Sequence, residues 1–246
     1  MTDYRKYRLS VQETLLYSGL YIGIFLLLGK VFYDAFWTAF VLAVTLPFLL
    51  RKKAKMLAVR RQEKLALEFR EFILAFSATL KSGYSAENAI TQAGCDLAYL
   101  YGEESAMVKE CRHMEKQLLN NHSPEQLLLE FAKRSGQAEI QDFAAVFAIA
   151  KRSGGNISAI LRNTADVIAE KIEVKREIQL LYAAKRMEQS VMNVVPIAII
   201  GYVRLTTPDY FDGLYGNAFG VMIMTVCLMV YAGAFFWAQK IMDIEV

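Results

Sequence analysis

The residue types that most often perform catalysis are few in this 246-residue sequence, and their spacing assembles no catalytic set. His113 and His122 lie nine residues apart, which is neither a metal-ligand spacing nor part of a Ser-His-Asp signature. The three cysteines, Cys95, Cys111 and Cys227, form no CxxC pair, and their odd number argues against a disulfide framework. We therefore predict that the chain is not an enzyme and carries no cofactor or metal.

Two further patterns resemble chemical sites but have simpler explanations. Gly154 and Gly155 lack the neighbouring Lys and Ser or Thr of a phosphate-binding loop, so we interpret them as a break between helices. Asp166 and Glu170 lie one helical turn apart, a spacing that suits a divalent cation or an acid pair. A solvated helix face explains the same spacing, and the sequence leaves cation binding open.

The elements that would position these residues follow from a segregation of apolar and charged residues. Hydrophobic residues make up 55% of the chain and charged residues 22%. Apolar runs lie near its two ends, at residues 15–29, 31–50, 191–205 and 218–238. A helix of about 20 apolar residues crosses a bilayer, and residues 9–14 would extend the short first run. We predict an integral membrane protein with four transmembrane helices in two hairpins.

The predicted domains are an N-terminal membrane hairpin (residues 1–50), a cytoplasmic helical domain (51–189) and a C-terminal membrane hairpin (190–246). Lys and Arg residues crowd both ends of the middle domain, whereas the hairpin turns hold few. Basic flanks stay on the cytoplasmic side, so we expect the middle domain and both termini there. The net charge of +3 is too small to indicate nucleic-acid binding.

Apolar residues in the middle domain recur at helical spacing. Five of them, three or four positions apart, share one face that a partner helix must cover. They are Leu65, Phe69, Phe72, Phe76 and Leu80. No sustained alternation indicates strands, and Pro124 is the one proline of this domain. We predict an all-α fold with a cytoplasmic six-helix bundle.

Capping signals divide this bundle into its helices. Ser85 begins the second helix, and Ser123 with Pro124 in the first helical position begins a later one. Asn156 caps the sixth helix, which continues without a breaker into the third apolar run. Three glycines end helices: Gly83, Gly102 and Gly136.

Two segments resemble the domain shared by type II secretion F proteins and the Tad/Flp pilus membrane proteins. They are residues 80–89 (LKSGYSAENA) and 151–157 (KRSGGNI) with Leu161, continued by 175–178 (KREI), 183–186 (AAKR) and Pro196. Their order and spacing agree with the family from about residue 60 onward. Larger members resemble a tandem of two such domains, whereas this chain holds one. A single domain is the pattern of the Tad/Flp branch and its TadB/TadC-like proteins.

The resemblance implies a platform protein of the bacterial inner membrane with one F-type domain. Such a platform couples a cytoplasmic ATPase to pilin extraction and filament assembly in a Tad/Flp-like type IV pilus or a type II secretion machine. The implied partners are that ATPase, prepilin or pilin subunits, the lipid bilayer, and a second copy or a paralogous platform protein. The sequence leaves the filament and the oligomeric state open.

For partner contacts we select the two predicted turns and the charged stretch of the sixth helix, although glycine turns also arise wherever two helices reverse direction. These residues are Gly83, Tyr84, Ser85, Glu87, Arg152, Gly154, Gly155, Asn156, Asp166, Glu170, Lys175 and Arg176. In the third apolar run we expect Asn193 and Pro196 at a helix contact, because a polar group inside a bilayer is costly without a partner.

Two alternatives from other functional classes are a small membrane transporter and a membrane-bound signalling module. The apolar runs hold almost no ionisable residue beyond Asp34 and Arg204 near their ends. They therefore offer no proton relay or polar substrate site. No kinase or cyclase motif supports signalling. The platform is the function that we predict.

Overall fold

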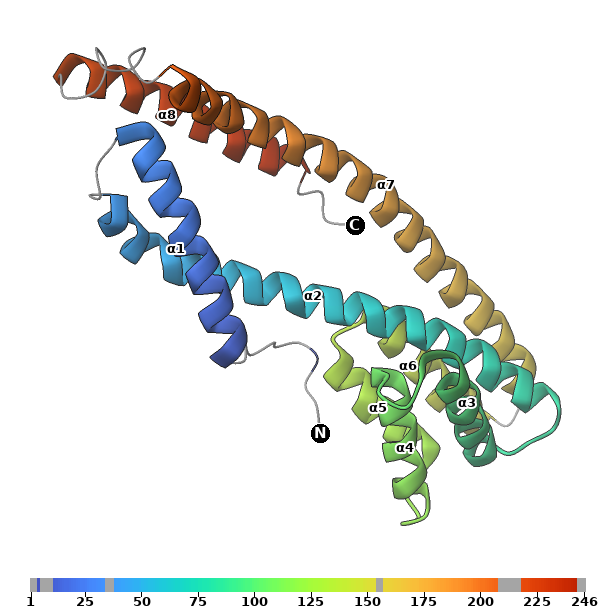
Figure 1. Cartoon of the computed structure of the whole chain (residues 1–246). Coiled ribbons are helices and arrows are strands. Elements are labelled where there is room, and N and C mark those ends of the chain that lie inside the picture. The colour runs from blue at the N-terminus through green and yellow to red at the C-terminus, as the bar shows by residue number, and fades with distance from the viewer. Residues whose placement is uncertain (1–3, 5–10, 34–37, 154–156, 208–217, 243–246) are drawn as a thin grey trace. The chain divides into compact units, whose positions relative to one another are not determined.

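A computed structural model describes the chain except for residues 1–3, 5–10, 34–37, 154–156, 208–217 and 243–246. Every regular element in the described part is an α-helix (Figure 1). The helices are α1 (Val11–Tyr33), α2 (Thr38–Lys81), α3 (Ala86–Tyr101), α4 (Ala106–Leu118), α5 (Pro124–Ser135), α6 (Ala138–Ser153), α7 (Ile157–Thr206) and α8 (Ala218–Met242). The all-α prediction is confirmed for these residues.

The chain divides into two compact units. Unit 1 consists of residues 1–8 and 54–176, and unit 2 consists of residues 9–53 and 177–246. Helices α3 to α6 lie wholly in unit 1, and α1 and α8 lie in unit 2. The two long helices, α2 and α7, contribute residues to both units.

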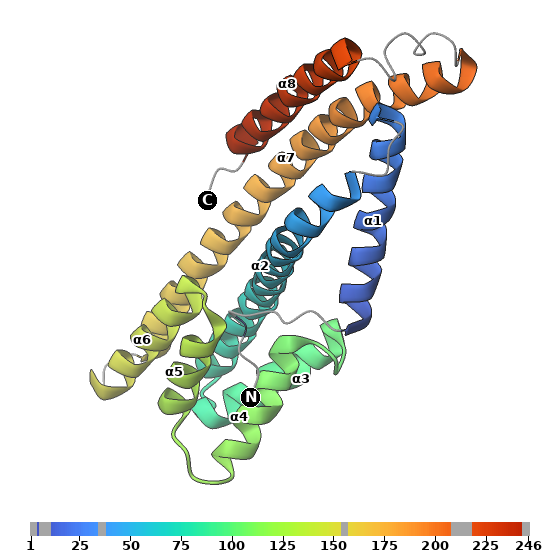
Figure 2. The ribbon, with the colours of Figure 1, turned by 90° about the vertical axis from the view of Figure 1, so that its left-hand side faces the viewer.

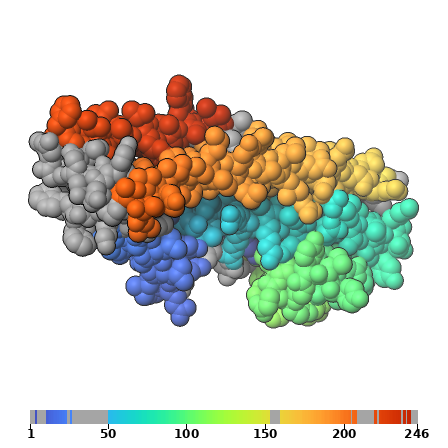
Figure 3. All heavy atoms as spheres, turned by 45° about the horizontal axis from the view of Figure 1, so that its top comes forward, coloured from blue at the N-terminus to red at the C-terminus, as the bar shows by residue number. Residues whose placement is uncertain are grey.

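In unit 1 the four short helices pair into two hairpins. Helix α3 packs against α4, and α5 packs against α6, as Figure 2 shows. The green atoms near residue 100 lie directly against α2 in the space-filling view (Figure 3). One buried contact joins the first hairpin to α2: the Met107 N–H donates to Glu68 Oε2 at 3.0 Å. The hairpins therefore cover the part of α2 that belongs to unit 1.

Phenylalanine rings form the centre of unit 1. The fully buried rings are Phe69, Phe72, Phe76, Phe131, Phe143 and Phe147. The Phe69 ring centroid lies 6.3 Å from that of Phe131 and 5.7 Å from that of Phe143, so α2, α5 and α6 meet there. The predicted apolar face of α2, from Leu65 to Leu80, is confirmed, because each of its five residues is at most 9% exposed.

The first part of α7 closes the same core. Leu161, Ala165, Ile168 and Ile172 are buried at intervals of three and four residues. That spacing places them on one face of the helix, so an apolar stripe of α7 packs on the core.

The predicted capping signals are also confirmed. The Ser85 and Ser123 hydroxyls accept the backbone N–H groups three residues later, at 3.3 and 3.4 Å, and begin α3 and α5. Gly102 and Gly136 follow the ends of α3 and α5 as predicted. The predicted break at Gly154 and Gly155 and the cap at Asn156 lie outside the described residues.

Unit 2 carries large apolar side chains on its surface. Leu15 on α1 is 68% exposed, and Val230 on α8 is also 68% exposed. Others with more than half of their surface exposed include Leu16, Leu20, Val191, Met192, Val194, Ile199, Tyr202, Phe219, Met222 and Met229. Extended apolar surfaces of this kind mark places where a protein meets a membrane or another protein.

The prediction of four transmembrane helices is not supported by the described residues. None of the helices in that part of the chain combines the length and the apolarity that crossing a membrane requires. The predicted turns of the two hairpins, at residues 34–37 and 208–217, lie outside the described residues.

Candidate functional site

The turn between α2 and α3 and the first turn of α3 hold four of the residues that we predicted as partner contacts. Gly83 adopts a positive φ of 86°, which a residue with a side chain adopts only with strain, and so lets the chain reverse direction. The Tyr84 N–H then donates to the Thr79 carbonyl at 3.4 Å. Tyr84 itself is 59% exposed, and Ser85 and Glu87 are exposed beside it.

Lys151, near the end of α6, connects this turn to a second helix start. Its Nζ lies 3.9 Å from a Glu87 carboxylate oxygen and 2.9 Å from Glu125 Oε1, in the first turn of α5. Burial acts to raise the pKa of Glu125, but the hydrogen bonds from Lys151, from the backbone and from Ser123, together with the Lys151 charge, outweigh burial and lower the pKa overall. Arg152 is exposed next to Lys151.

Two predicted contact regions therefore meet at one end of unit 1. We call this surface the turn end: Gly83, Tyr84, Ser85, Glu87, Lys151 and Arg152. The other predicted members, Gly154, Gly155 and Asn156, lie outside the described residues. Lys151 was not among the predicted contact residues. The one indication in the sequence was its position beside the predicted break at Gly154 and Gly155.

The charged residues predicted on α7 are in different environments. Asp166, Glu170 and Arg176 are exposed. Lys175 is half-buried, and its Nζ donates to Glu139 Oε1 at 2.9 Å, which ties α7 to the start of α6. This lysine therefore already has an intramolecular partner.

Glu139 is a buried acid that no sequence pattern indicated. It is 2% exposed, and Lys171 Nζ lies 3.4 Å from the oxygen that Lys175 also contacts. Burial acts to raise the pKa of Glu139, but the Lys175 hydrogen bond and the nearby charges lower it overall. Glu139 is therefore held as a carboxylate between two lysines.

Asn193 and Pro196 lie in the part of α7 that belongs to unit 2. The Asn193 carbonyl accepts a hydrogen bond from the Tyr231 hydroxyl, which joins α7 to α8. Pro196 is exposed inside α7. Asn193 thus contacts a neighbouring helix through its backbone carbonyl.

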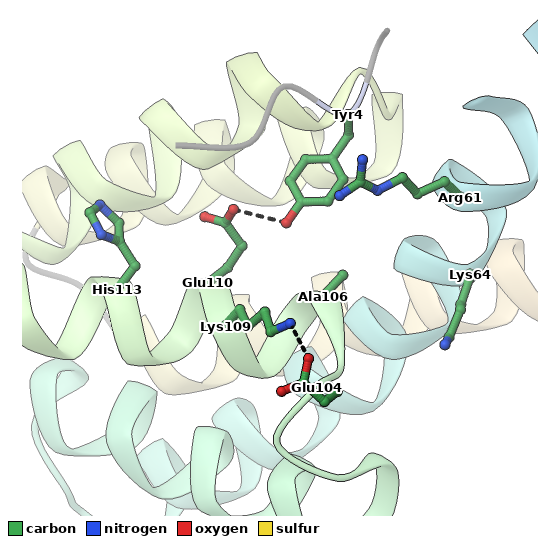
Figure 4. A pocket seen from close by; sticks show the side chains of 8 residues that line it. All are labelled: Tyr4, Arg61, Lys64, Glu104, Ala106, Lys109, Glu110 and His113. Atoms are coloured by element: carbon green, nitrogen blue, oxygen red, sulfur yellow. Dashed lines mark hydrogen bonds and ion pairs between the residues drawn. The ribbon is translucent and has the colours of Figure 1, made fainter. Parts of the chain in front are cut away.

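A second polar cluster surrounds a cavity of about 430 Å³ in unit 1 (Figure 4). Its lining includes Tyr4, Arg61, Lys109, Glu110 and His113. The Tyr4 hydroxyl points at Glu110 and donates to Oε1 at 2.9 Å. Burial raises the pKa of Tyr4, and the neighbouring Glu110 charge raises it further. Tyr4 therefore stays a neutral hydrogen-bond donor.

No sequence pattern indicated this cluster. The apolar runs predicted a membrane hairpin over residues 1–50, whereas Tyr4 is 3% exposed and belongs to unit 1. Glu110 and Arg134 pair across helices α4 and α5, and no periodic pattern connects them in the sequence. Among the described residues, no group of three or more His, Cys, Asp or Glu side chains could hold a metal ion.

The sequence of this chain matches a known protein family. The family model for protein F of the type II secretion system (T2SS) matches residues 72–203, more than half of the chain. The chain belongs to this family. The F family is associated with platform proteins of secretion and pilus-assembly machines, which generally work with ATPases and other platform proteins. No curated protein and no solved structure matches the chain.

The F-family match includes the whole turn end and the pair formed by Glu110 and Arg134. Tyr4 and Arg61 lie before its first residue. The cavity therefore combines side chains from inside and outside the F-family match.

Proposed function

We propose that this F-family protein is the platform of a Tad/Flp-like pilus or a type II secretion machine in the bacterial inner membrane. Unit 1 lies in the cytoplasm and engages an ATPase through the turn end. Pilin subunits and a second platform chain, either a copy or a paralogue, complete the machine. The chain itself is not an enzyme, and ATP hydrolysis belongs to the partner.

The observation that carries this proposal is the turn end. The helices of an F-family domain bring an exposed aromatic ring, Tyr84, together with exposed charges of both signs, Glu87 and Arg152. Aromatic and arginine side chains contribute most of the binding energy in many protein interfaces. The ion pairs of Lys151 hold the three helix ends in place and so preorganise the surface.

The proposed membrane location draws on unit 2. Its exposed apolar side chains on α1, α7 and α8 would be costly in water, at about 25 cal/mol per Å² of apolar area. Lipid contact removes that cost. The four apolar runs and the basic residues that flank them support an arrangement of two hairpins with unit 1 in the cytoplasm.

A co-purification experiment tests the partner. The full chain, solubilised in detergent, is purified with a candidate secretion ATPase from the same organism, first as wild type and then as Tyr84→Ala/Arg152→Glu. We expect the double variant to recover at least fivefold less ATPase. Tyr99→Ala is the matched control, because Tyr99 is 92% exposed at the opposite end of α3. Equal recovery with both variants, or ATP hydrolysis by the purified chain alone, would contradict the proposal.

The native cysteines test the location. Cys95 on α3 and Cys227 on α8 are both exposed, in units 1 and 2 respectively. A membrane-impermeant maleimide should label Cys95 only after the inner membrane is opened, and should label Cys227 slowly throughout because lipid covers it. Rapid labelling of Cys95 in intact spheroplasts would place unit 1 on the outer side of the inner membrane and contradict the proposed location.

A further inference from the structure

Tyr4, the described residue nearest the N-terminus, is buried in unit 1. Besides the hydroxyl bond to Glu110, the Tyr4 N–H donates to the Arg134 carbonyl at 3.1 Å. The Arg61 guanidinium lies 5.0 Å from the centroid of the Tyr4 ring, over its face. We call Arg61, Glu110 and Arg134 the tyrosine socket.

The socket is held together without Tyr4. Arg134 donates from Nη1 to Glu110 Oε1 at 2.9 Å and from Nη2 to Oε2 at 2.7 Å, a bidentate pair between α5 and α4. Glu110 is 5% exposed, so the carboxylate is a fixed acceptor with its charge already balanced. Departure of Tyr4 therefore leaves no unpaired buried charge.

Each part of the socket recognises a different feature of a tyrosine in a peptide. Glu110 accepts from the phenol hydroxyl, which a phenylalanine lacks. Arg61 contributes a cation–π contact with the ring face. The Arg134 carbonyl accepts from a main-chain N–H, which any peptide segment offers. These are the contacts of a peptide-binding site.

We propose that the tyrosine socket is a peptide-docking site, which the chain's own N-terminal segment occupies reversibly through Tyr4. Tyr4 acts as a latch on unit 1, and its release opens the cavity that it now lines. Because the ligand is tethered, its effective concentration is on the order of millimolar, and a weak intrinsic affinity is sufficient to keep the socket occupied. The inference does not depend on the identity of the ATPase or filament.

Hydroxyl-radical footprinting of the full chain in detergent tests the latch. Mass spectrometry should find Tyr4 modified at least tenfold more slowly than Tyr99, which is 92% exposed. Glu110→Leu/Arg134→Met removes the acceptor and its partner together, so no buried charge is orphaned, and should speed Tyr4 modification at least fivefold. Glu104→Gln is the control, because Glu104 lines the same cavity but bonds to Lys109.

Arg61→Ala provides a second test in case the double variant Glu110→Leu/Arg134→Met unfolds. Arg61 is only partly buried on α2, and its removal should speed Tyr4 modification about twofold without changing the circular dichroism spectrum. A wild-type Tyr4 modified as fast as Tyr99 would overturn the proposal. So would a Tyr4 that remains equally protected in the folded socket variants.

Exchange with a free peptide tests docking itself. A labelled peptide with the sequence of residues 1–8 is added at millimolar concentration to the full-length Tyr4→Ala chain, and binding is followed by fluorescence anisotropy. We expect the wild-type chain, whose own Tyr4 competes, to bind the peptide at least fivefold more weakly. A peptide with Tyr4→Ala should bind at least tenfold more weakly, and one with Tyr4→Phe should also bind more weakly, because it lacks the hydroxyl that donates to Glu110. Equal binding by the peptide with Tyr4→Ala, or no binding of the unchanged peptide to the Tyr4→Ala chain, would refute the site.

Discussion

Phe69 on α2 has no exposed surface, whereas Val230 on α8 is 68% exposed, although both are large apolar residues in long helices. The difference extends to their surroundings. Six phenylalanine rings are buried together in unit 1, whereas valine, leucine and methionine side chains of unit 2 are exposed. Large apolar residues thus form the buried core of unit 1, whereas many of those in unit 2 lie on its surface. We interpret the outward pattern as adaptation to an apolar environment.

The sharpest test of this contrast is truncation of an apolar side chain in each unit. Phe69→Ala leaves a cavity among rings of three helices and should lower the free energy of unfolding by about 3–5 kcal/mol. Met229→Ala, at a position that is 62% exposed, should change it by about 0.5 kcal/mol or less. Urea unfolding of the detergent-solubilised chain, followed by circular dichroism, measures both. Similar losses would remove the distinction between the units.

A charge introduced at exposed apolar positions separates contact with lipid from contact with water. If α8 crosses a membrane, as proposed, Val230→Arg should disfavour membrane insertion by about 2.5–3.5 kcal/mol, because arginine is costly at the middle of a spanning helix. Val167→Arg, at a position of unit 1 that is 65% exposed, should have no such effect. The fraction of protein that resists alkaline extraction from membranes is the measurement. An unchanged fraction for Val230→Arg would place that side chain outside lipid.

Helix caps should matter for the short helices of unit 1. Ser85→Ala removes the hydroxyl that accepts from Asn88 at the start of α3 and should cost about 1 kcal/mol. Ser85→Asn retains an acceptor and should recover most of that loss. Thermal unfolding compares the two variants, and equal destabilisation would show that the hydroxyl is not the stabilising group. Because Ser85 belongs to the turn end, measurements of ATPase binding by its variants must be corrected for this loss of stability.

The smallest expected effect concerns the buried acid of unit 1. The pKa of Glu139 is lowered in the folded chain, so its contribution to stability is present above the unfolded pKa of about 4.3 and is lost as the pH falls through the folded value. Its lysine partners are partly exposed and screened, which limits the contribution to about 1 kcal/mol. Glu139→Gln should therefore flatten the dependence of the urea midpoint on pH below about 4. An identical pH profile in wild type and variant would contradict this assignment.

Much of unit 1 was predictable from local patterns. The buried stripe from Leu65 to Leu80 follows from its spacing, and Ser85 and Ser123 begin their helices because their hydroxyls satisfy free N–H groups. The turn end was predicted in part, through Gly83 and Arg152. Lys151 was not, because its partners on α3 and α5 are distant in the sequence.

The polar contacts of Glu139 and Tyr4 could not be predicted for the same reason. An acid in the first turn of a helix is common, and nothing local indicates that lysines from α7 will cover Glu139. Tyr4 lies in the N-terminal stretch that precedes the first apolar run, so we predicted that it belongs to the membrane hairpin. Its actual partners come from α2, α4 and α5.

The sequence by itself determined the helices, their caps and the faces they bury, because each depends on residues within a few turns of one another. Its agreement with the F family over residues 72–203 likewise follows from the order of residues. Only the tertiary structure decided which charges meet: Lys151 with two helix starts, Glu139 with two lysines, and Tyr4 with Glu110. Such pairings require helices to pack first, since packing alone brings charges from distant segments within hydrogen-bonding distance.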